Sequence, residues 1–260
     1  MPRFAANLNF LFTELPLLDR FDAAAKAGFT AVESTNLYEA TPEEVAARLR
    51  ANGLTLALFN MPSGNAAAGE RGLTALAGRE REFWTAFETA LRYADATGAR
   101  RMHLLAGLIE HGAQHATYVA NLKRAARAAA AAGIEVLIEP INGRDTPGFF
   151  LNRTEQARDV IAEVGEPNLR LQLDLYHRQI EQGDVARAIA EFAPLTAHYQ
   201  IASPPDRGEP DDGEMNYAYL FRCIDKTGFQ GWIGCEYRPR KGTVEGLKWA
   251  AACGVTLSGP

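Results

Sequence analysis

The 260-residue sequence has few cysteines and no long apolar run, and both shortages exclude classes of protein. Its three cysteines, Cys223, Cys235 and Cys253, are an odd number without Cys-x-x-Cys spacing, so they neither frame disulfides nor cage zinc by themselves. The most apolar stretch, residues 125–141, is rich in alanine and is interrupted by charged residues. It is therefore not expected to span a membrane.

Basic residues are also fewer than acidic residues. The sequence has 27 Lys and Arg against 32 Asp and Glu, a net charge of −5, which argues against general attraction to nucleic acid or to an anionic membrane. The opening Met-Pro-Arg-Phe-Ala-Ala-Asn has no apolar segment behind its one basic residue, so we expect no signal peptide and a cytoplasmic location. A small molecule is the expected partner, and a homo-oligomer is compatible with the sequence.

Two catalytic signatures are missing as well. There is no Gly-x-Ser-x-Gly motif, so a serine hydrolase of the α/β class has no support. No glycine-rich phosphate loop follows the first predicted strand, so a dinucleotide site has none either.

Short β-branched runs alternate with longer stretches of helical period along the whole chain. The predicted strands are Phe4–Asn9, Ala31–Ser34, Thr55–Asn60, Arg101–Ala106, Glu135–Ile141, Leu169–Tyr176, Thr196–Ala202 and Trp232–Tyr237. The predicted helices are Leu17–Ala27, Pro42–Asn52, Glu80–Thr97, Thr117–Ala132, Thr154–Val164, Val185–Phe192, Tyr217–Thr227 and Val244–Cys253.

Eight strand–helix units predict one closed (β/α)8 barrel, a TIM barrel, as a single domain over residues 1–260. A doubly wound open sheet is the competing architecture, weakened by the missing phosphate loop. Two connections are long, residues 61–79 after the third strand and 203–216 after the seventh. Both follow the carboxyl ends of strands, where barrel enzymes bind substrate, although a surface insertion would look the same.

Polar side chains end four consecutive predicted strands. Glu139, Asp174, Gln200 and Glu236 stand where strands covered by helices should be apolar. A charged group there is costly unless it is paired, protonated or bound to metal. We therefore expect the four to converge at the carboxyl-terminal mouth of the barrel, rather than to be unrelated residues of the rim.

Three carboxylates and one amide are hard oxygen donors, which suit Mg²⁺ or Mn²⁺ better than zinc. Glu139 and Glu236, on the fifth and eighth strands, could face each other across a substrate. One carboxylate would then take a proton from carbon and the other would return it nearby, while the metal would stabilise the developing enediolate.

Other polar residues are candidates for contact with substrate. His177 follows Asp174 by three residues and could touch a substrate hydroxyl, or it could be structural. Arg207 and Glu209, in the loop after the seventh strand, could reach the site, and Arg207 could pair with an anionic substrate. Arg71, in the loop after the third strand, is a second candidate partner for a carboxylate. Each arginine could equally be an ordinary surface charge.

Five motifs together resemble the hydroxypyruvate isomerase family of xylose-isomerase-like barrels, and the resemblance covers nearly the whole chain. They are Pro-Arg-Phe-Ala-Ala-Asn-Leu at 2–8, Ala-Gly-Glu-Arg-Gly at 68–72, Ile-Glu-Pro-Ile-Asn at 138–142, Asp-Arg-Gly-Glu-Pro-Asp-Asp-Gly-Glu at 206–214 and Gly-Trp-Ile-Gly-Cys-Glu-Tyr at 231–237.

The resemblance implies a divalent-metal site on Glu139, Asp174, Gln200 and Glu236, with the two glutamates as the acid–base pair. It also implies that His177 and Arg207 contact substrate. The family isomerises hydroxypyruvate or 2-oxo-tetronate, which differ by one hydroxymethyl group. The stretches at 56–60 and 209–214 are more similar to the tetronate enzymes.

One segment departs from the family pattern. After Glu33 the family runs aromatic and apolar, whereas this chain reads Ser34-Thr35-Asn36-Leu37. Drift in a loop and an altered substrate both explain it. The alternative functions are a ketose 3-epimerase or aldose–ketose isomerase acting on sugars, a barrel endonuclease, and a catalytically silent binding barrel. Gln200, where sugar enzymes present a histidine, counts against the first of these. The five histidines and acidic balance suit a zinc endonuclease poorly, and retention of both glutamates argues against a silent barrel.

Overall fold

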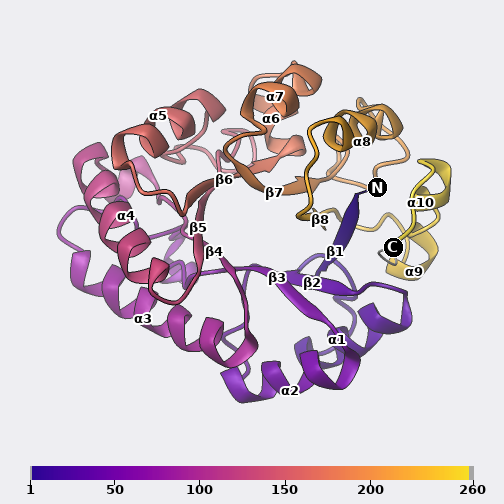
Figure 1. Cartoon of the computed structure of the whole chain (residues 1–260), viewed down its shortest axis with the longest axis horizontal. Coiled ribbons are helices and arrows are strands. Elements are labelled where there is room, and N and C mark those ends of the chain that lie inside the picture. Colours follow the sequence, from indigo (N-terminus) through magenta and orange to yellow (C-terminus); the bar gives the residue numbers. More distant parts are fainter. Residues whose placement is uncertain (1, 258–260) are drawn as a thin grey trace.

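The computed structural model describes residues 2–257 and closes eight parallel strands into one barrel, in the order of the sequence. The predicted (β/α)8 architecture is confirmed, and Figure 1 shows the strands as an inner ring. The predicted domain also included residues 1 and 258–260, which lie outside the described residues. The strands are β1 (Arg3–Asn7), β2 (Ala31–Ser34), β3 (Thr55–Asn60), β4 (Arg101–His103), β5 (Glu135–Ile138), β6 (Leu169–Asp174), β7 (Thr196–Ile201) and β8 (Trp232–Cys235).

Helices surround the strands as an outer ring (Figure 1). They are α1 (Leu17–Lys26), α2 (Pro42–Asn52), α3 (Glu80–Thr97), α4 (His115–Ala130), α5 (Thr154–Val164), α6 (Leu175–Glu181), α7 (Val185–Phe192), α8 (Tyr217–Lys226), α9 (Thr243–Gly246) and α10 (Trp249–Ala252), with the 3₁₀ turns η1 (Ala66–Ala68) and η2 (Ile109–His111). No helix among residues 2–257 combines the length and apolarity needed to cross a bilayer.

The boundaries of α2 illustrate how local sequence sets the helices. Thr41 accepts a hydrogen bond from the backbone N–H of Glu44, and the Glu44 carboxylate accepts one from the backbone N–H of Thr41, so the two form a capping box. Pro42 fits the first helical turn, and Gly53 adopts φ 63° beyond the last turn. These signals are local, which explains why the predicted range, Pro42–Asn52, is also the observed one.

Most predicted strands and several predicted helices differ from the observed ones by one to three residues at their ends, and in two places the kind or number of elements differs. The sixth strand was expected to continue to Tyr176, but Leu175 and Tyr176 open α6, because the Asp174 side chain accepts a hydrogen bond from the Tyr176 N–H. The single helix expected over Val244–Cys253 is instead divided into α9 and α10. Gly246, a poor helix former, ends α9.

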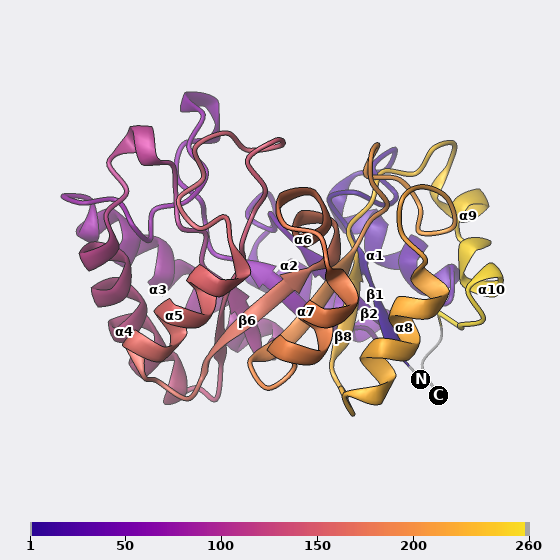
Figure 2. The same cartoon turned by 90° about the horizontal axis from the view of Figure 1, so that it is seen from above.

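The main hydrophobic core fills the layer between strands and helices. Inside the barrel, small apolar groups such as Ala5, Ala31 and Ala57 form a separate cluster. The connections after β3, β4 and β5 rise beyond the helices on one side of the barrel in Figure 2. That side lies at the carboxyl ends of the strands, so the fold collects the long loops where the strand-end polar residues were expected.

Candidate active site at the mouth of the barrel

Three carboxylates and one imidazole meet at the carboxyl-terminal mouth of the barrel. Glu139 directly follows β5, Asp174 ends β6, Glu236 directly follows β8, and His177 lies in the first turn of α6. Potential ligand atoms of all four lie within 4.8 Å of one another, and all four residues are buried. The structure thus brings together three of the four expected strand-end residues, with His177 beside them.

The two carboxylate oxygens of Asp174 have different surroundings. Its Oδ1 accepts the Tyr176 N–H at 2.8 Å and so caps α6, which turns the next residues back over the mouth of the barrel. Its Oδ2 is buried and accepts no hydrogen bond. The same is true of Oε1 of Glu139. Buried carboxylate oxygens are rarely left without a partner, so these two atoms are suited to bind an ion.

Burial dominates the electrostatics of the cluster. Removal from water, followed by repulsion from Glu236 and Asp174, raises the pKa of Glu139 well above its usual value. Burial likewise raises the pKa of Asp174 to about 6 and that of Glu236 to about 8, against an opposing effect of Arg207 on both. A carboxyl with a raised pKa holds its proton at a pH where a free carboxyl has lost it, which a general acid requires.

Arg207 is the cation of the site. Its Nη2 donates to Oε2 of Glu236 at 2.5 Å and lies 3.8 Å from Oδ2 of Asp174. Its guanidinium lies between the rings of Phe10 and Tyr176, 4.8 Å from each centroid. Held in this way at the edge of the cluster, Arg207 can present an N–H fork to an anion.

The tautomer of His177 follows from its hydrogen bonds. Oδ1 of Asn142 accepts the backbone N–H of Asp145 at 2.8 Å, so its amide NH₂ faces Nδ1 of His177 at 2.6 Å. The backbone N–H of Asn142 points to the same nitrogen at 3.4 Å. With Nδ1 as acceptor, the proton of the neutral ring lies on Nε2, which is 3.5 Å from Asp174 and 3.9 Å from Glu139. Burial lowers the pKa of His177, which keeps the ring neutral. The side chain is therefore better placed to donate a hydrogen bond than to ligate a metal.

Gln200, the fourth expected metal ligand, lies on β7 beside Glu33, for which the sequence predicted no role. Its Nε2 donates to Glu33 at 2.8 Å, and its Oε1 accepts from Gln172 at 2.5 Å. Its role as a metal ligand stays a prediction.

The two remaining candidates have other partners. Glu209 is buried, and its carboxylate lies 3.2 Å from Nε of Arg240 and accepts the Arg240 backbone N–H at 2.9 Å. It thereby ties the loop after β7 to the loop after β8. Arg71 is exposed and donates to the backbone oxygen of Glu70. The structure places neither side chain against the carboxylate cluster, and substrate contact by either stays a prediction.

Two cavities open near this end of the barrel. One, of about 480 Å³, is lined by residues that follow β5, β6, β7 and β8, including Arg144, Tyr176 and Arg207. The other, of about 460 Å³, is lined at the ends of β2 and β3, by Thr35 and Asn36 among others. The polar segment that departs from the family pattern therefore borders a cavity.

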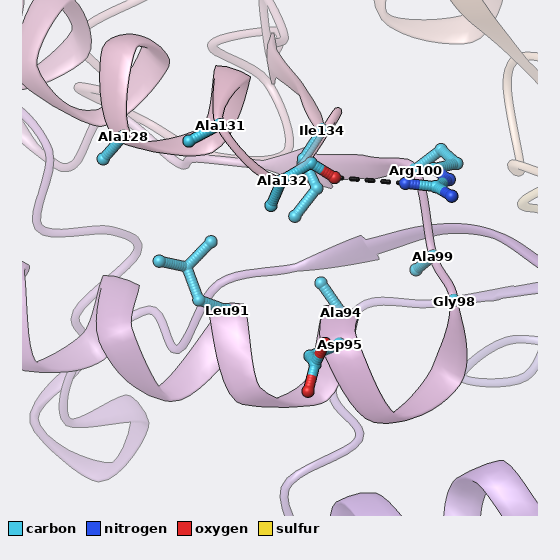
Figure 3. Close-up of a pocket in the computed structure, with 10 residues that line it drawn as sticks. All are labelled: Leu91, Ala94, Asp95, Gly98, Ala99, Arg100, Ala128, Ala131, Ala132 and Ile134. Atoms are coloured by element: carbon cyan, nitrogen blue, oxygen red, sulfur yellow. Dashed lines mark hydrogen bonds between the residues drawn. The ribbon is translucent and has the colours of Figure 1, made fainter.

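A further cavity, of about 440 Å³, lies between α3 and α4, before β4 and β5 begin (Figure 3). Alanines make up much of its lining, and Arg100 crosses it to donate to the backbone oxygen of Ala132 at 3.1 Å. Asp95 is the only acidic residue among its lining residues. This end of a barrel contributes to stability rather than catalysis, so we assign it no chemistry.

Sequence reasoning missed several residues of the site. Asn142 lies within the Ile-Glu-Pro-Ile-Asn motif but carried no expected role, and Asn7 and Glu33 lay within predicted strands without being counted as site residues. Glu33 had a usable signal, because it follows Ala31 and Val32 as an acid at the end of an apolar strand, the same pattern that identified Glu139.

Comparisons with known proteins identify the family of the chain. A family model described as a xylose isomerase-like TIM barrel matches residues 21–253. The 2-oxo-tetronate isomerase of Cupriavidus necator is 54% identical over 253 residues, 96% of this chain and 97% of that protein. The hydroxypyruvate isomerase of Escherichia coli is 44% identical over 253 residues, 96% of this chain and 98% of that protein.

A crystal structure from Brucella melitensis, named as an AP endonuclease of family 2, has a TM-score of 0.94 at 46% identity and covers 97% of this chain and 99% of that one. Full-length matches to proteins named as isomerases, on the same barrel, leave one assignment: the chain belongs to the hydroxypyruvate isomerase family, an enzyme family within the xylose isomerase-like TIM barrels.

Proposed function

We propose that this protein is a metal-dependent isomerase of short 2-oxo-3-hydroxy acids, with 2-oxo-tetronate as the preferred substrate and hydroxypyruvate as the shorter one. The observation that carries the proposal is the meeting of Glu139 and Glu236 beside Asp174, all buried, at the ends of strands from different parts of the chain. Two carboxyls that lie close together and have raised pKa values can move a proton between neighbouring carbons of a substrate.

A divalent cation fits the side chains present. Oxygens of Glu139 and Asp174 lack hydrogen-bond partners, and carboxylates dominate the cluster. Mg²⁺ and Mn²⁺ prefer such donors, whereas a barrel endonuclease would be expected to gather several zinc-binding histidines. Glu139, Asp174, Gln200 and Glu236 would hold the ion, which supplies a positive charge that stabilises oxyanions.

The side chains have distinct roles in the proposed reaction. One glutamate removes the proton from C3 of the substrate, which leaves an enediolate. The other delivers a proton to C2, and the hydroxyl and carbonyl exchange places with no net change of composition. Nε2–H of His177 donates to a substrate oxygen, and Arg207 binds the substrate carboxylate.

The preference for 2-oxo-tetronate rests on polar side chains at the carboxyl ends of β2 and β3. Thr35, Asn36 and Asn60 line the cavity at the ends of β2 and β3, where hydroxyls beyond C3 can be bound. The Cupriavidus relative named for 2-oxo-tetronate is also more similar, at 54% identity, than the Escherichia coli relative named for hydroxypyruvate, at 44%. One hydroxymethyl group discriminates only modestly, so both acids should react.

Proton NMR in D₂O tests the proposal. Metal-stripped protein supplied with Mg²⁺ should convert both acids, place deuterium at C2 of the product, act faster on 2-oxo-tetronate and stop when EDTA is added. Absence of product from either acid, from protein that binds metal, would contradict the proposal and favour sugar substrates. The relative rates identify the preferred acid.

Arg207→Ala should raise KM for the acid by about 10- to 100-fold and lower kcat much less, because a charge-assisted bond to an anion contributes about 1.5–3 kcal/mol. Steady-state kinetics on wild type and variant measure both parameters. Arg71→Ala removes an exposed arginine of the loop after β3 and shows how far a second cation contributes. An unchanged KM in Arg207→Ala would show that Arg207 does not bind the carboxylate.

A further inference from the structure

Glu33 is a buried carboxylate at the centre of a hydrogen-bond network inside the barrel. Its Oε1 accepts from Nδ2 of Asn7 at 2.9 Å and from Nε2 of Gln200 at 2.8 Å, and its Oε2 lies 2.6 Å from Nε2 of His198. Only 1% of the residue is exposed. An apolar side chain would fill this position at far lower cost in desolvation, so three converging donors indicate a function beyond packing.

The barrel makes room for this carboxylate. Gly234 on β8 faces Glu33, and a Cβ at that position would lie 2.2 Å from each of the two carboxylate oxygens. Any other residue at Gly234 would therefore displace Glu33. The space in which the carboxylate lies is therefore left by β8, which is separated from β2 by β1.

Hydrogen bonds connect Glu33 with one proposed catalytic residue, Glu236, and with one proposed metal ligand, Gln200. The Asn7 amide that donates to Glu33 also donates to Oε1 of Glu236 at 3.1 Å. Gln200 donates directly to Glu33, so its Oε1 must face the other way. Because a carboxylate only accepts hydrogen bonds, Glu33 favours the orientation in which each amide turns its NH₂ group toward it. The amide oxygens are held as well, since Oδ1 of Asn7 accepts the backbone N–H of Asn9 at 3.0 Å and Oε1 of Gln200 accepts from Gln172 at 2.5 Å.

We propose that Glu33 is a positioning residue of the active site. It binds the amide groups of Asn7 and Gln200, holds Glu236 through Asn7, and places a further negative charge beneath the carboxylate cluster, where it favours a divalent cation. Glu33 touches neither substrate nor reacting atoms. The inference rests on the proposed function, because the proposed reaction gives Glu236 its acid–base role and Gln200 its role as a metal ligand.

Glu33→Gln is the informative variant. The amide oxygen can still accept from Asn7 and Gln200, and its NH₂ can face Nε2 of His198, whose Nδ1 has no hydrogen-bond partner and is free to carry the ring proton. The substitution therefore removes charge with little change of shape. Outer partners of metal ligands typically contribute about 10- to 100-fold, so Mn²⁺ dissociation constants and kcat should both worsen by at least about tenfold while KM stays nearly constant.

A matched control lies on the same strand as Gln200. Thr196 on β7 is buried and donates to the backbone oxygen of Phe192 at 2.9 Å. Thr196→Val should lower the melting temperature while leaving Mn²⁺ affinity and kcat unchanged. If Glu33→Gln does not fold, Asn7→Ala cuts the link to Glu236 and should itself lower kcat about tenfold.

The experiment titrates metal-free protein with Mn²⁺, follows free Mn²⁺ by electron paramagnetic resonance, and then measures kcat and KM at saturating Mn²⁺. Wild-type affinity and kcat in Glu33→Gln would overturn this inference alone. Wild-type protein that neither binds Mn²⁺ nor turns over either acid would overturn the proposed function, and the inference with it.

Discussion

Glu139→Gln and Glu236→Gln should each fold like wild type and lose turnover by roughly 10²- to 10⁴-fold, the usual contribution of a general acid or base. Both side chains are buried at the mouth of the barrel, and an amide of the same shape cannot accept or deliver the proton. Steady-state rates at saturating Mn²⁺ and substrate measure the loss. Deuterium incorporation from D₂O into substrate and product measures proton removal separately.

Glu135→Gln is the matched control for these variants. Glu135 begins β5, at the opposite end of the strand from Glu139, and its carboxylate lies 3.0 Å from Nε of Arg101. The same chemical change there removes a half-exposed ion pair and should leave kcat unchanged. Near wild-type turnover in both Glu139→Gln and Glu236→Gln would refute the acid–base assignment, whatever the control shows.

The metal-free protein should lose stability as pH rises from about 5 to about 8. Burial raises the pKa of Glu139, and it raises that of Asp174 to about 6 and that of Glu236 to about 8. A carboxyl with a raised pKa keeps a proton in the folded state that the unfolded chain has released. Its contribution to the free energy of unfolding is complete below the unfolded pKa, near 4, and is lost as pH rises through the folded pKa.

Thermal unfolding of EDTA-treated protein at several pH values checks this expectation. The melting temperature should fall by several degrees across that range, since about 1 kcal/mol corresponds to about 2–4 °C for a chain of this size. Mn²⁺ should restore stability most at the alkaline end, where the carboxylates are already ionised. Glu236→Gln, which cannot ionise there, should flatten the fall. A flat profile in wild type would mean that the three carboxyls titrate as they do in the unfolded chain.

Local sequence signals predicted most of the fold. The capping box at Thr41 and Glu44 fixed the start of α2, and glycines with positive φ such as Gly53 and Gly98 marked helix ends. The error at β6 had the same local origin, because an aspartate that ends a strand and an aspartate that caps a helix look alike until the hydrogen bond to Tyr176 is seen.

The candidate site was only partly predictable. Glu139, Asp174 and Glu236 are visible because a charge at the end of an apolar strand contradicts the surrounding pattern, and the barrel topology brings strand ends together. Glu209 was expected to reach the site from its place in a long loop. In the structure its carboxylate is bound by Arg240 from the loop after β8, and its contact with substrate stays a prediction. Loop position alone does not say which way a side chain turns.

The sequence by itself determined the number and order of the strands and the carboxylates at their ends, because each of these depends on residues near one another in the chain. The barrel was predicted from the count of strand–helix units. Only the tertiary structure decided what surrounds those carboxylates. Asn7 meets Glu33 across 26 positions and Glu236 across 229, and His198 meets Glu33 across 165. These contacts depend on the closure and register of the barrel and on the space left by Gly234, which no local pattern records.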